Sequence, residues 1–482
     1  MNILFVVKTF SIVEPMGIMQ ISASVKSQGH KSFVASIDAD DILARIQEKE
    51  IDVVALSMLS TETKTFNELA QQIKGANPKV VIVAGGPHPT YFPQIVDEWP
   101  IDGVVVGEGD LVFGEIMKAV ENGESLDAIP NVHTKTCKNP VRPLVPDLDN
   151  LPWADRELVA DVTPLKYVRM KSFFATRGCP FACAYCFNSA YNQMYHGKGK
   201  ILRRRSVESL ICEIEQVKEK YPMDFVRFGD DAFIFKHDEW VEEFVDKYSS
   251  RIGLPFYFLI NPNCVTEKLV KRLKEAKCYS AMMGIECGNY QVRKDVLKRN
   301  VTNDTMLNVF KIFRDYDIKV FSNTILGLPG STLEDDLESL DFTLQCRPYY
   351  SGFTVMTPFP GTDLYKYCEE NDYLEEVAAM EDSFPQSMQQ DSCLKGISEE
   401  RKNIHRNILM LGPVANAFPF LKKWIVSKLI YGKPNVFFNA VGSLVRNYQN
   451  MKVWPFRKSP GSFWNIFWQV MRIDKKNYIK EK

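Results

Sequence analysis

Apolar and polar residues alternate in two regular patterns along the first 135 residues. Short apolar runs, typical of buried strands, occupy residues 3–7, 32–35, 53–57, 80–84 and 103–106. Between them, residues 18–28, 40–48 and 65–76 carry apolar side chains at helical spacing. This alternation predicts a doubly wound, Rossmann-like parallel sheet with helices on both faces, whose ligands bind at the carboxyl ends of the strands. We therefore predict an α/β domain over residues 1–135.

A second series of the same kind occupies residues 171–370. Its predicted strands are residues 173–176, 225–228, 256–260, 281–285, 319–325 and 352–357. Six strands with intervening helices predict a partial (β/α)6 barrel, whose site lies at the carboxyl ends of the strands. Residues 136–170 are irregular and rich in proline, which predicts a linker. Residues 371–482 are predicted to form a mostly helical C-terminal region.

Three cysteines follow the first predicted strand of the barrel: Cys179, Cys183 and Cys186, with the spacing C-x3-C-x2-C. Three thiolates on one short loop can hold three irons of a [4Fe–4S] cluster and leave the fourth iron open to a small molecule. A cluster held by protein alone needs a fourth cysteine, and the next one, Cys212, lies in a helix-like stretch. A three-cysteine zinc site is the alternative, but the loop has no histidine to complete a tetrahedron.

The cysteine loop resembles that of the radical S-adenosylmethionine (SAM) enzymes, in which the open iron chelates the amino and carboxylate groups of SAM. The resemblance implies further SAM contacts at Tyr185, inside the loop, and at Gly229 and Asp230, which follow a strand. The acidic run at Asp230 also suits an ordinary turn. The resemblance also implies a contact of Asn261 with the ribose or carboxylate of SAM, although the family often has arginine at this position. Glu286 lies in a Gly-Ile-Glu-Cys-Gly run similar to a family motif, which implies that it accepts a hydrogen bond from a cofactor hydroxyl.

Two loops of the first domain resemble motifs of cobalamin-binding domains. Ser57 and Leu59 follow one predicted strand, and the pair Gly85 and Gly86 follows the next. Paired glycines let the backbone approach a bulky ligand, although many nucleotide-binding sheets have such loops too. The third cobalamin motif, Asp-x-His-x-x-Gly, is absent, because none of the six histidines has an aspartate two residues before it. We therefore expect His88 to contact its own loop or the cofactor tail, and not to bind cobalt.

Charge is divided unevenly along a chain whose formal net charge is −1. The first 400 residues carry a net charge of −15 and the last 82 carry +14, together with Trp424, Trp454, Trp464 and Trp468. Three interpretations remain for this tail: a helical cap packed on the acidic remainder, a contact with a membrane or a lipid-like substrate, and nucleic-acid binding. Eleven cysteines, no signal-like start and no apolar run of membrane-spanning length predict a cytoplasmic protein, with possible peripheral contact with the inner face of the membrane.

Together these motifs identify the chain as resembling the cobalamin-binding radical SAM enzymes over about residues 1–370. The resemblance implies three cofactors, a [4Fe–4S] cluster, SAM and cobalamin, and an external electron donor of the ferredoxin or flavodoxin type. It favours methyl transfer to an unactivated carbon of a small-molecule or lipid-like substrate. Two alternatives remain: an oxidative or ring-forming reaction without methyl transfer, and a non-catalytic corrinoid-binding sensor or carrier.

Overall fold

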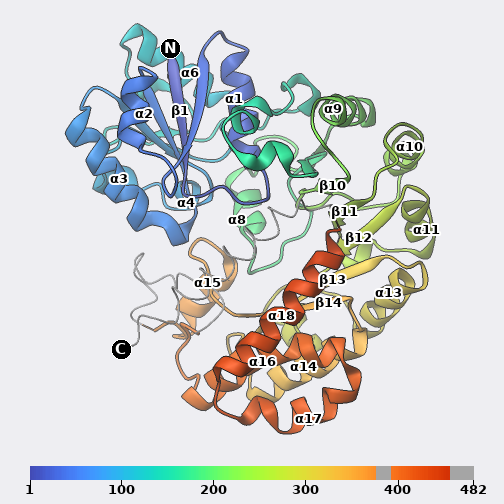
Figure 1. Cartoon of the computed structure of the whole chain (residues 1–482). Helices are drawn as coiled ribbons and strands as arrows, with labels where there is room; N and C mark the ends of the chain where they lie inside the picture. The colour runs from blue at the N-terminus through green and yellow to red at the C-terminus, as the bar shows by residue number, and fades with distance from the viewer. Residues whose placement is uncertain (376–391, 456–482) are drawn as a thin grey trace.

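Two six-stranded sheets form the body of the protein in the computed structural model, which describes residues 1–375 and 392–455. Figure 1 shows the first sheet with its helices in blue, the second in green and yellow, and a group of C-terminal helices in orange and red. Each sheet is built from strand–helix repeats, so the carboxyl ends of its parallel strands share one edge.

The first sheet has the strand order β2-β1-β3-β4-β5-β6, and its first five strands are parallel. Its strands are β1 (Asn2–Val7), β2 (Lys31–Ser36), β3 (Val53–Ser57), β4 (Val81–Gly85), β5 (Gly103–Val105) and β6 (Val132–His133). The five parallel strands agree with the predicted runs to within a residue at each end. The antiparallel β6 was not predicted, because two residues are too short to show a hydrophobic period.

Helices cover both faces of this sheet. The helices α1 (Met16–Lys26) and α6 (Val112–Asn122) pack on one face, and α2 (Ile42–Glu48) and α3 (Thr63–Ala76) pack on the other. Alternate residues of β1 divide between the two cores: Phe5 belongs to one and Leu4 to the other. A strand buried on both faces reads as a continuous apolar run, which is why β1 was visible in the sequence.

The second sheet has the order β14-β13-β12-β11-β10-β7 and is parallel throughout. Its strands are β7 (Met170–Phe173), β10 (Phe225–Phe228), β11 (Phe256–Leu259), β12 (Cys278–Met282), β13 (Lys319–Leu326) and β14 (Tyr350–Val355). The outer face is covered by α9 (Val207–Lys220), α10 (Glu239–Lys247), α11 (Glu267–Glu275), α13 (Asn303–Asp315) and α14 (Leu333–Cys346). Because β7 and β14 are both edge strands, the six-stranded barrel is partial.

The first barrel strand lies earlier in the chain than predicted. The strand expected at residues 173–176 instead ends at Phe173, and Thr176 and Arg177 form a separate strand, β8, that pairs with β9 (Arg203–Arg204). The buried carboxylate of Asp230 accepts hydrogen bonds from the backbone N–H groups of Ala175 and Thr176, which draws the chain out of the sheet. The strand expected at residues 281–285 likewise lies three residues earlier.

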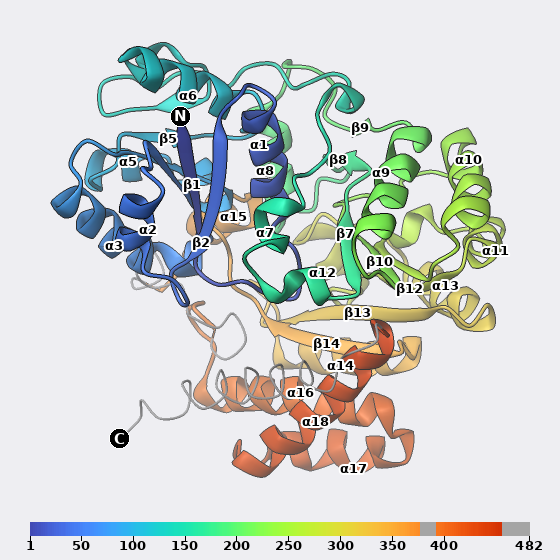
Figure 2. The ribbon, with the colours of Figure 1, turned by 45° about the horizontal axis from the view of Figure 1, so that its top comes forward.

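The C-terminal helices are α16 (Glu399–Ala417), α17 (Lys422–Ser427) and α18 (Val436–Val453). The helix α16 packs against β14 and α14, and the end of α18 reaches the barrel strands, where Ser280 donates a hydrogen bond to the carbonyl of Val453 at 2.7 Å. Figure 2 shows these helices at the bottom of the view, below β13 and β14. Trp464 and Trp468 lie outside the described residues. No helix in residues 1–375 and 392–455 is long and apolar enough to cross a membrane.

Candidate functional site

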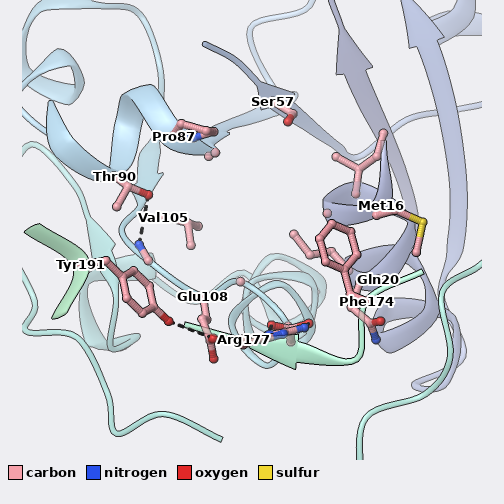
Figure 3. Close-up of a pocket in the computed structure, with 18 of the residues that line it drawn as sticks. Met16, Gln20, Ser57, Pro87, Thr90, Val105, Glu108, Phe174, Arg177 and Tyr191 are labelled. Atoms are coloured by element: carbon pink, nitrogen blue, oxygen red, sulfur yellow. Dashed lines mark hydrogen bonds and ion pairs between the residues drawn. The ribbon is translucent and has the colours of Figure 1, made fainter. Parts of the chain in front are cut away.

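A cavity of about 890 Å³ lies where the carboxyl edges of the two sheets face each other. Ser57, Gly85 and Gly86 line it from the first sheet. Tyr185 and Cys186 line it from the cysteine loop, together with residues of β8 and α8 (Phe187–Met194). Figure 3 shows this open space, with Ser57 on one wall and Arg177 on another. One continuous cavity therefore joins the loops predicted for cobalamin to the loop predicted for the cluster.

The glycine pair after β4 leaves room for a bulky ligand. Gly86 has φ +97°, in the region that favours glycine, and a Cβ at this position would lie 3.3 Å from the carbonyl oxygen of Met58. The same Cβ would lie 3.5 Å from the hydroxyl oxygen of Ser57, and Ser57 and Gly86 both line the cavity. Leu59 is 51% exposed and lies outside the cavity lining, so its predicted cofactor contact stays a prediction.

His88 lies on the short helix α4 (Pro87–Tyr91) and is buried away from the cavity lining. Its ring stacks on Phe92 with centroids 4.6 Å apart, and Nδ1 lies 3.2 Å from Oγ of Ser60. Burial lowers the pKa of His88 to about 4, so the imidazole is neutral at pH 7. Among the residues that the structure describes, no histidine lines the cavity, and contact of His88 with its own loop agrees with the prediction.

The three cysteines lie between β8 and α8. Cys186 stands at the N-cap of α8 and lines the cavity, whereas Cys183 is buried. The carbonyl of Cys179 accepts a hydrogen bond from the side chain of Asn192 at 3.0 Å, which ties the start of the loop to α8. In the described part of the chain, no three His, Cys, Asp or Glu side chains converge as ligands of a single ion.

The loop chemistry suits a metal cluster. Burial raises the pKa of Cys179 to about 12 and also raises the pKa of Cys186, so both thiols are protonated in the absence of metal. Metal binding replaces those protons, because thiolates are the form of cysteine that ligates iron. Three sulfur donors on one loop, one of them open to the cavity, fit a [4Fe–4S] cluster whose remaining iron faces a small molecule.

The two aspartates after β10 have opposite surroundings. Asp230 is fully buried, and its Oδ1 accepts from the N–H of Ala175 and the hydroxyl of Thr176, both at 2.8 Å. Burial raises the pKa of Asp230 to about 7, although these hydrogen bonds oppose the rise. Asp231 instead lines the cavity, where its carboxylate meets Asn188, and burial by the cavity walls raises its pKa. The structure thus directs Asp231 toward the cavity, and the predicted contact of Asp230 with SAM stays a prediction.

Glu286 and Tyr185 meet beside the cysteine loop. The hydroxyl of Tyr185 donates to Oε1 of Glu286 at 3.0 Å, and Arg299 lies within 3.5 Å of the same hydroxyl. Arg299 also donates to the carbonyl of Gly284 at 2.9 Å and approaches the sulfur of Cys183 at 4.0 Å. Burial raises the pKa of Glu286, and the guanidinium of Arg299 opposes this rise. Sequence reasoning found Tyr185 and Glu286 but missed Arg299, which has no motif of its own.

Two other predicted residues lie outside the cavity lining. Asn261 caps the short helix η6 (Pro262–Cys264), where its side chain accepts from the N–H of Asn263 at 3.0 Å. Gly229 lies beside Arg227 and Phe174, and a Cβ there would approach both side chains to within 3.0 Å. Both residues border the barrel mouth, and their cofactor contacts stay predictions.

Charged residues that the sequence analysis did not select join the two sheets. Arg177, at the end of β8, forms two short hydrogen bonds with Asp110 and lies 3.4 Å from Glu108. Glu108 also accepts from the hydroxyl of Tyr191 at 2.9 Å, as Figure 3 shows, and from Arg203 at 2.6 Å. Burial alone would raise the pKa of Asp110, but the Arg177 guanidinium outweighs it and holds this pKa below its usual range. The run Gly-Glu-Gly at residues 107–109 was the only local signal of this contact.

Comparisons with protein families give two matches along the chain. Residues 3–117 match the B12 binding domain, and residues 173–343 match the radical SAM superfamily. The two matches contain the loops that line the cavity from the first sheet and from the cysteine loop.

Relatives with similar sequences cover both matched regions. An uncharacterized methyltransferase of Pyrococcus horikoshii is 26% identical over 75% of this chain and 79% of its own length. The anaerobic magnesium-protoporphyrin IX monomethyl ester cyclase of Rubrivivax gelatinosus is 24% identical over 73% of this chain and 66% of the cyclase. The hopanoid C-3 methylase of Methylococcus capsulatus is 24% identical, over 74% and 69%.

Two solved structures share the fold. The radical SAM methyltransferase TsrM of Kitasatospora setae superposes with a TM-score of 0.69 at 15% identity, covering 94% of this chain and 98% of TsrM. The cobalamin-dependent radical SAM enzyme OxsB gives a TM-score of 0.69 at 14% identity, covering 94% and 72%. The order of the first sheet, the barrel and the C-terminal helices is therefore shared with both.

Proposed function

This chain belongs to the cobalamin-binding radical SAM enzymes, and we propose that it transfers a methyl group to an unactivated carbon of a small-molecule or lipid-like substrate. Its cofactors are a [4Fe–4S] cluster, SAM and cobalamin. When bound, they supply a reductive cleavage of SAM and a transferable methyl group. The observation that supports the proposal is the cavity lined by both Gly86 and Cys186, because both loops that we assign to cofactors then border the same space.

Each cofactor has residues suited to hold it. We assign the cluster to Cys179, Cys183 and Cys186, because they are three sulfur donors on one loop with Cys186 open to the cavity. We assign cobalamin to the cradle at Ser57, Gly85 and Gly86, because all three residues line the cavity at the carboxyl ends of the first sheet's strands. Since no histidine lines this cavity, we expect cobalt to receive no imidazole from this chain.

For SAM, we assign direct contacts to the residues that line the cavity and indirect roles to those that do not. Asp231 offers a carboxylate to an ammonium group at the cavity wall. Asp230 contributes indirectly, because it fixes the backbone of Ala175 and Thr176 just before the cysteine loop. Tyr185 and Glu286 hold each other in place beside Cys186, where Tyr185 faces the cavity.

The electron for SAM cleavage comes from outside the protein in this proposal. An external donor of the ferredoxin or flavodoxin type would meet this need. The carbon to be methylated belongs to a small molecule or a lipid, as the names of relatives such as the hopanoid methylase suggest.

Isotope transfer tests the proposal. The reconstituted holoenzyme is incubated anaerobically with reductant, candidate extracts and SAM that carries a labelled methyl group, and the products are analysed by mass spectrometry. We expect a product heavier by one labelled methyl group, which is absent with Cys183→Ala. An unlabelled product that has lost hydrogen would instead support a ring-forming or oxidative reaction. Absence of SAM turnover with every extract and reductant would support a corrinoid sensor or carrier.

A further inference from the structure

We propose that α17, α18 and the turn η10 (Leu429–Tyr431) between them form a face that docks on an anionic membrane surface. This inference concerns where the protein resides while it acts, and it does not depend on methyl transfer. Both helices pack on α16 at the end of the molecule remote from the first sheet (Figures 1 and 2).

The helix α18 carries an apolar stripe on its outer side. Phe437, Leu444, Tyr448 and Met451 recur at intervals of seven, four and three residues and are 70%, 67%, 57% and 38% exposed. Residues at this spacing share one face of a helix. A stripe of this kind on a helix surface marks a contact with another phase or molecule, since isolated exposed apolar residues are common but a continuous row is not.

The inner side of α18 fixes which residues face outward. Gly442 packs so closely on α16 that a Cβ would lie 2.5 Å from the carbonyl oxygen of Met410. Gln449 is buried and donates to the carbonyl of Tyr349 at 3.1 Å. The helix therefore cannot rotate to hide its stripe without breaking this packing.

The segment around α17 adds aromatic side chains. Phe420 is 79% exposed, Trp424 is 54% exposed and Tyr431 is 51% exposed, while Ile425 and Ile430 between them are buried in the core beneath α16. Tryptophan and tyrosine suit the boundary between water and lipid, because each has an apolar ring and a polar N–H or O–H group.

The positive charge of this region indicates that the membrane surface it binds is anionic. Residues 401–455 contain nine lysines and arginines and no aspartate or glutamate. Some of these cations pair with acids elsewhere, as Arg401 does with Asp336 and Lys422 with Asp341. Lys423, Lys428, Lys433 and Lys452 form no ion pair within the described part of the chain, and they border the exposed apolar residues in the sequence.

This arrangement favours a membrane over the other possible occupants. Apolar side chains along a helix with lysines beside them match a helix that lies in the headgroup layer, with rings inserted and ammonium groups at the phosphates. A nucleic-acid surface would place cations at its centre, with aromatic rings between them as stacking platforms. A second copy of the chain would bring its own lysines against these lysines, which like charges oppose.

Vesicle flotation with the full-length holoenzyme tests the inference. Vesicles of phosphatidylcholine alone are compared with vesicles that also contain about one third phosphatidylglycerol. We expect binding only with phosphatidylglycerol, and weaker binding as salt approaches about 0.5 M, where the screening length falls to a few ångströms. The double variant Lys423→Gln/Lys428→Gln should bind about 25-fold more weakly, at about fivefold for each charge.

A second double variant tests the apolar stripe, and a pair of lysines on the barrel provides the control. Phe437→Ser/Leu444→Ser should lower vesicle affinity at least tenfold, and both double variants should keep wild-type melting and reductive SAM cleavage in solution, because the altered side chains are exposed. Lys268→Gln/Lys311→Gln removes two lysines that are 76% and 64% exposed on the barrel helices and should bind like wild type.

Three results would overturn the inference. The first is no flotation with phosphatidylglycerol at low salt. The second is equal loss of binding in the barrel-lysine control. The third is a dimer in solution that Phe437→Ser/Leu444→Ser converts to monomer, which would assign the face to a second copy. Loss of methyl transfer with vesicle binding intact would concern the proposed function alone.

Discussion

Arg177 and Asp110 join the cluster side of the cavity to the first sheet through a two-pronged ion pair, with Nη1–Oδ2 at 2.6 Å and Nη2–Oδ1 at 2.9 Å. Arg177 lies two residues before Cys179, and Asp110 follows the Gly-Glu-Gly run after β5. Because the Asp110 side chain is only 6% exposed, the pair lies largely out of water. It therefore ties the start of the cysteine loop to the loop that follows β5 of the first sheet.

Removing one partner of this pair should be costly. In Arg177→Met, the buried Asp110 carboxylate loses both of its hydrogen bonds to arginine, and we expect a loss of about 3 kcal/mol in unfolding free energy, as for other broken buried pairs. The double variant Arg177→Met/Asp110→Leu should recover part of the loss, because no buried charge remains unpaired. Urea denaturation of the three proteins measures the difference. Equal destabilisation by the single and the double variant would contradict this role of the pair.

The three loop cysteines should be individually essential for the cluster. Anaerobically reconstituted wild-type protein should contain about four irons per chain, and Cys183→Ala should lose both the iron and SAM cleavage, since a three-thiolate site has no spare ligand. Cys212→Ala is the matched control, because Cys212 lies on α9, outside the loop. Iron analysis and detection of 5′-deoxyadenosine provide the measurements. Full SAM cleavage by Cys183→Ala would refute the assignment.

A comparison of alanine substitutions at Gly86 and Gly123 distinguishes a steric clash of the added Cβ from the strain of a positive φ. Both have positive φ, at +97° and +69°, but a Cβ on Gly123 would meet nothing within 4 Å, whereas a Cβ on Gly86 would crowd the carbonyl of Met58 and the hydroxyl of Ser57, which lines the cavity. Gly86→Ala should therefore reduce the corrinoid retained after reconstitution by tenfold or more, and Gly123→Ala should retain the wild-type amount. Visible absorption spectra quantify the bound corrinoid. Equal retention by the two variants would argue against the cradle.

His88 should not ligate cobalt. Its ring is buried against Phe92 and Ser60, outside the cavity lining, and its pKa near 4 reflects burial. The electron paramagnetic resonance spectrum of the Co(II) form should show no nitrogen splitting from histidine, and His88→Phe should leave the spectrum unchanged. Nitrogen splitting in the wild-type protein that disappears in His88→Phe would contradict this expectation.

Asp230 should make stability depend on pH. Its pKa is about 7 in the folded protein and about 4 for an unfolded aspartate, so the folded state binds the proton more tightly. The stabilisation this gives is fully present below about pH 4 and is lost as pH rises to about 7. Asp230→Asn keeps an oxygen acceptor for Ala175 and Thr176 but does not titrate. Its melting temperature should therefore fall less than that of wild type between pH 4 and 7, whereas parallel melting curves would refute the prediction.

The sequence by itself determined most strands of the two sheets and pointed to the loops that border the cavity. Apolar runs such as residues 53–57 mark strands buried on both faces, and the spacing of Cys179, Cys183 and Cys186 is a local property of one loop. Both signals lie within a few residues, so neither needs knowledge of distant contacts. The positions of Ser57, Gly85 and Gly86 at the cavity followed from the rule that ligands lie at the carboxyl ends of parallel strands.

Only the tertiary structure decided which side chains face the cavity. Asp230 and Asp231 are neighbours with the same chemistry, yet the first is buried against Ala175 and Thr176 and the second lines the cavity. Arg177 and Asp110 are 67 residues apart and meet because the edges of two sheets face each other. Such choices depend on the packing of elements distant in the chain, and packing leaves no local pattern of residues from which it could be predicted.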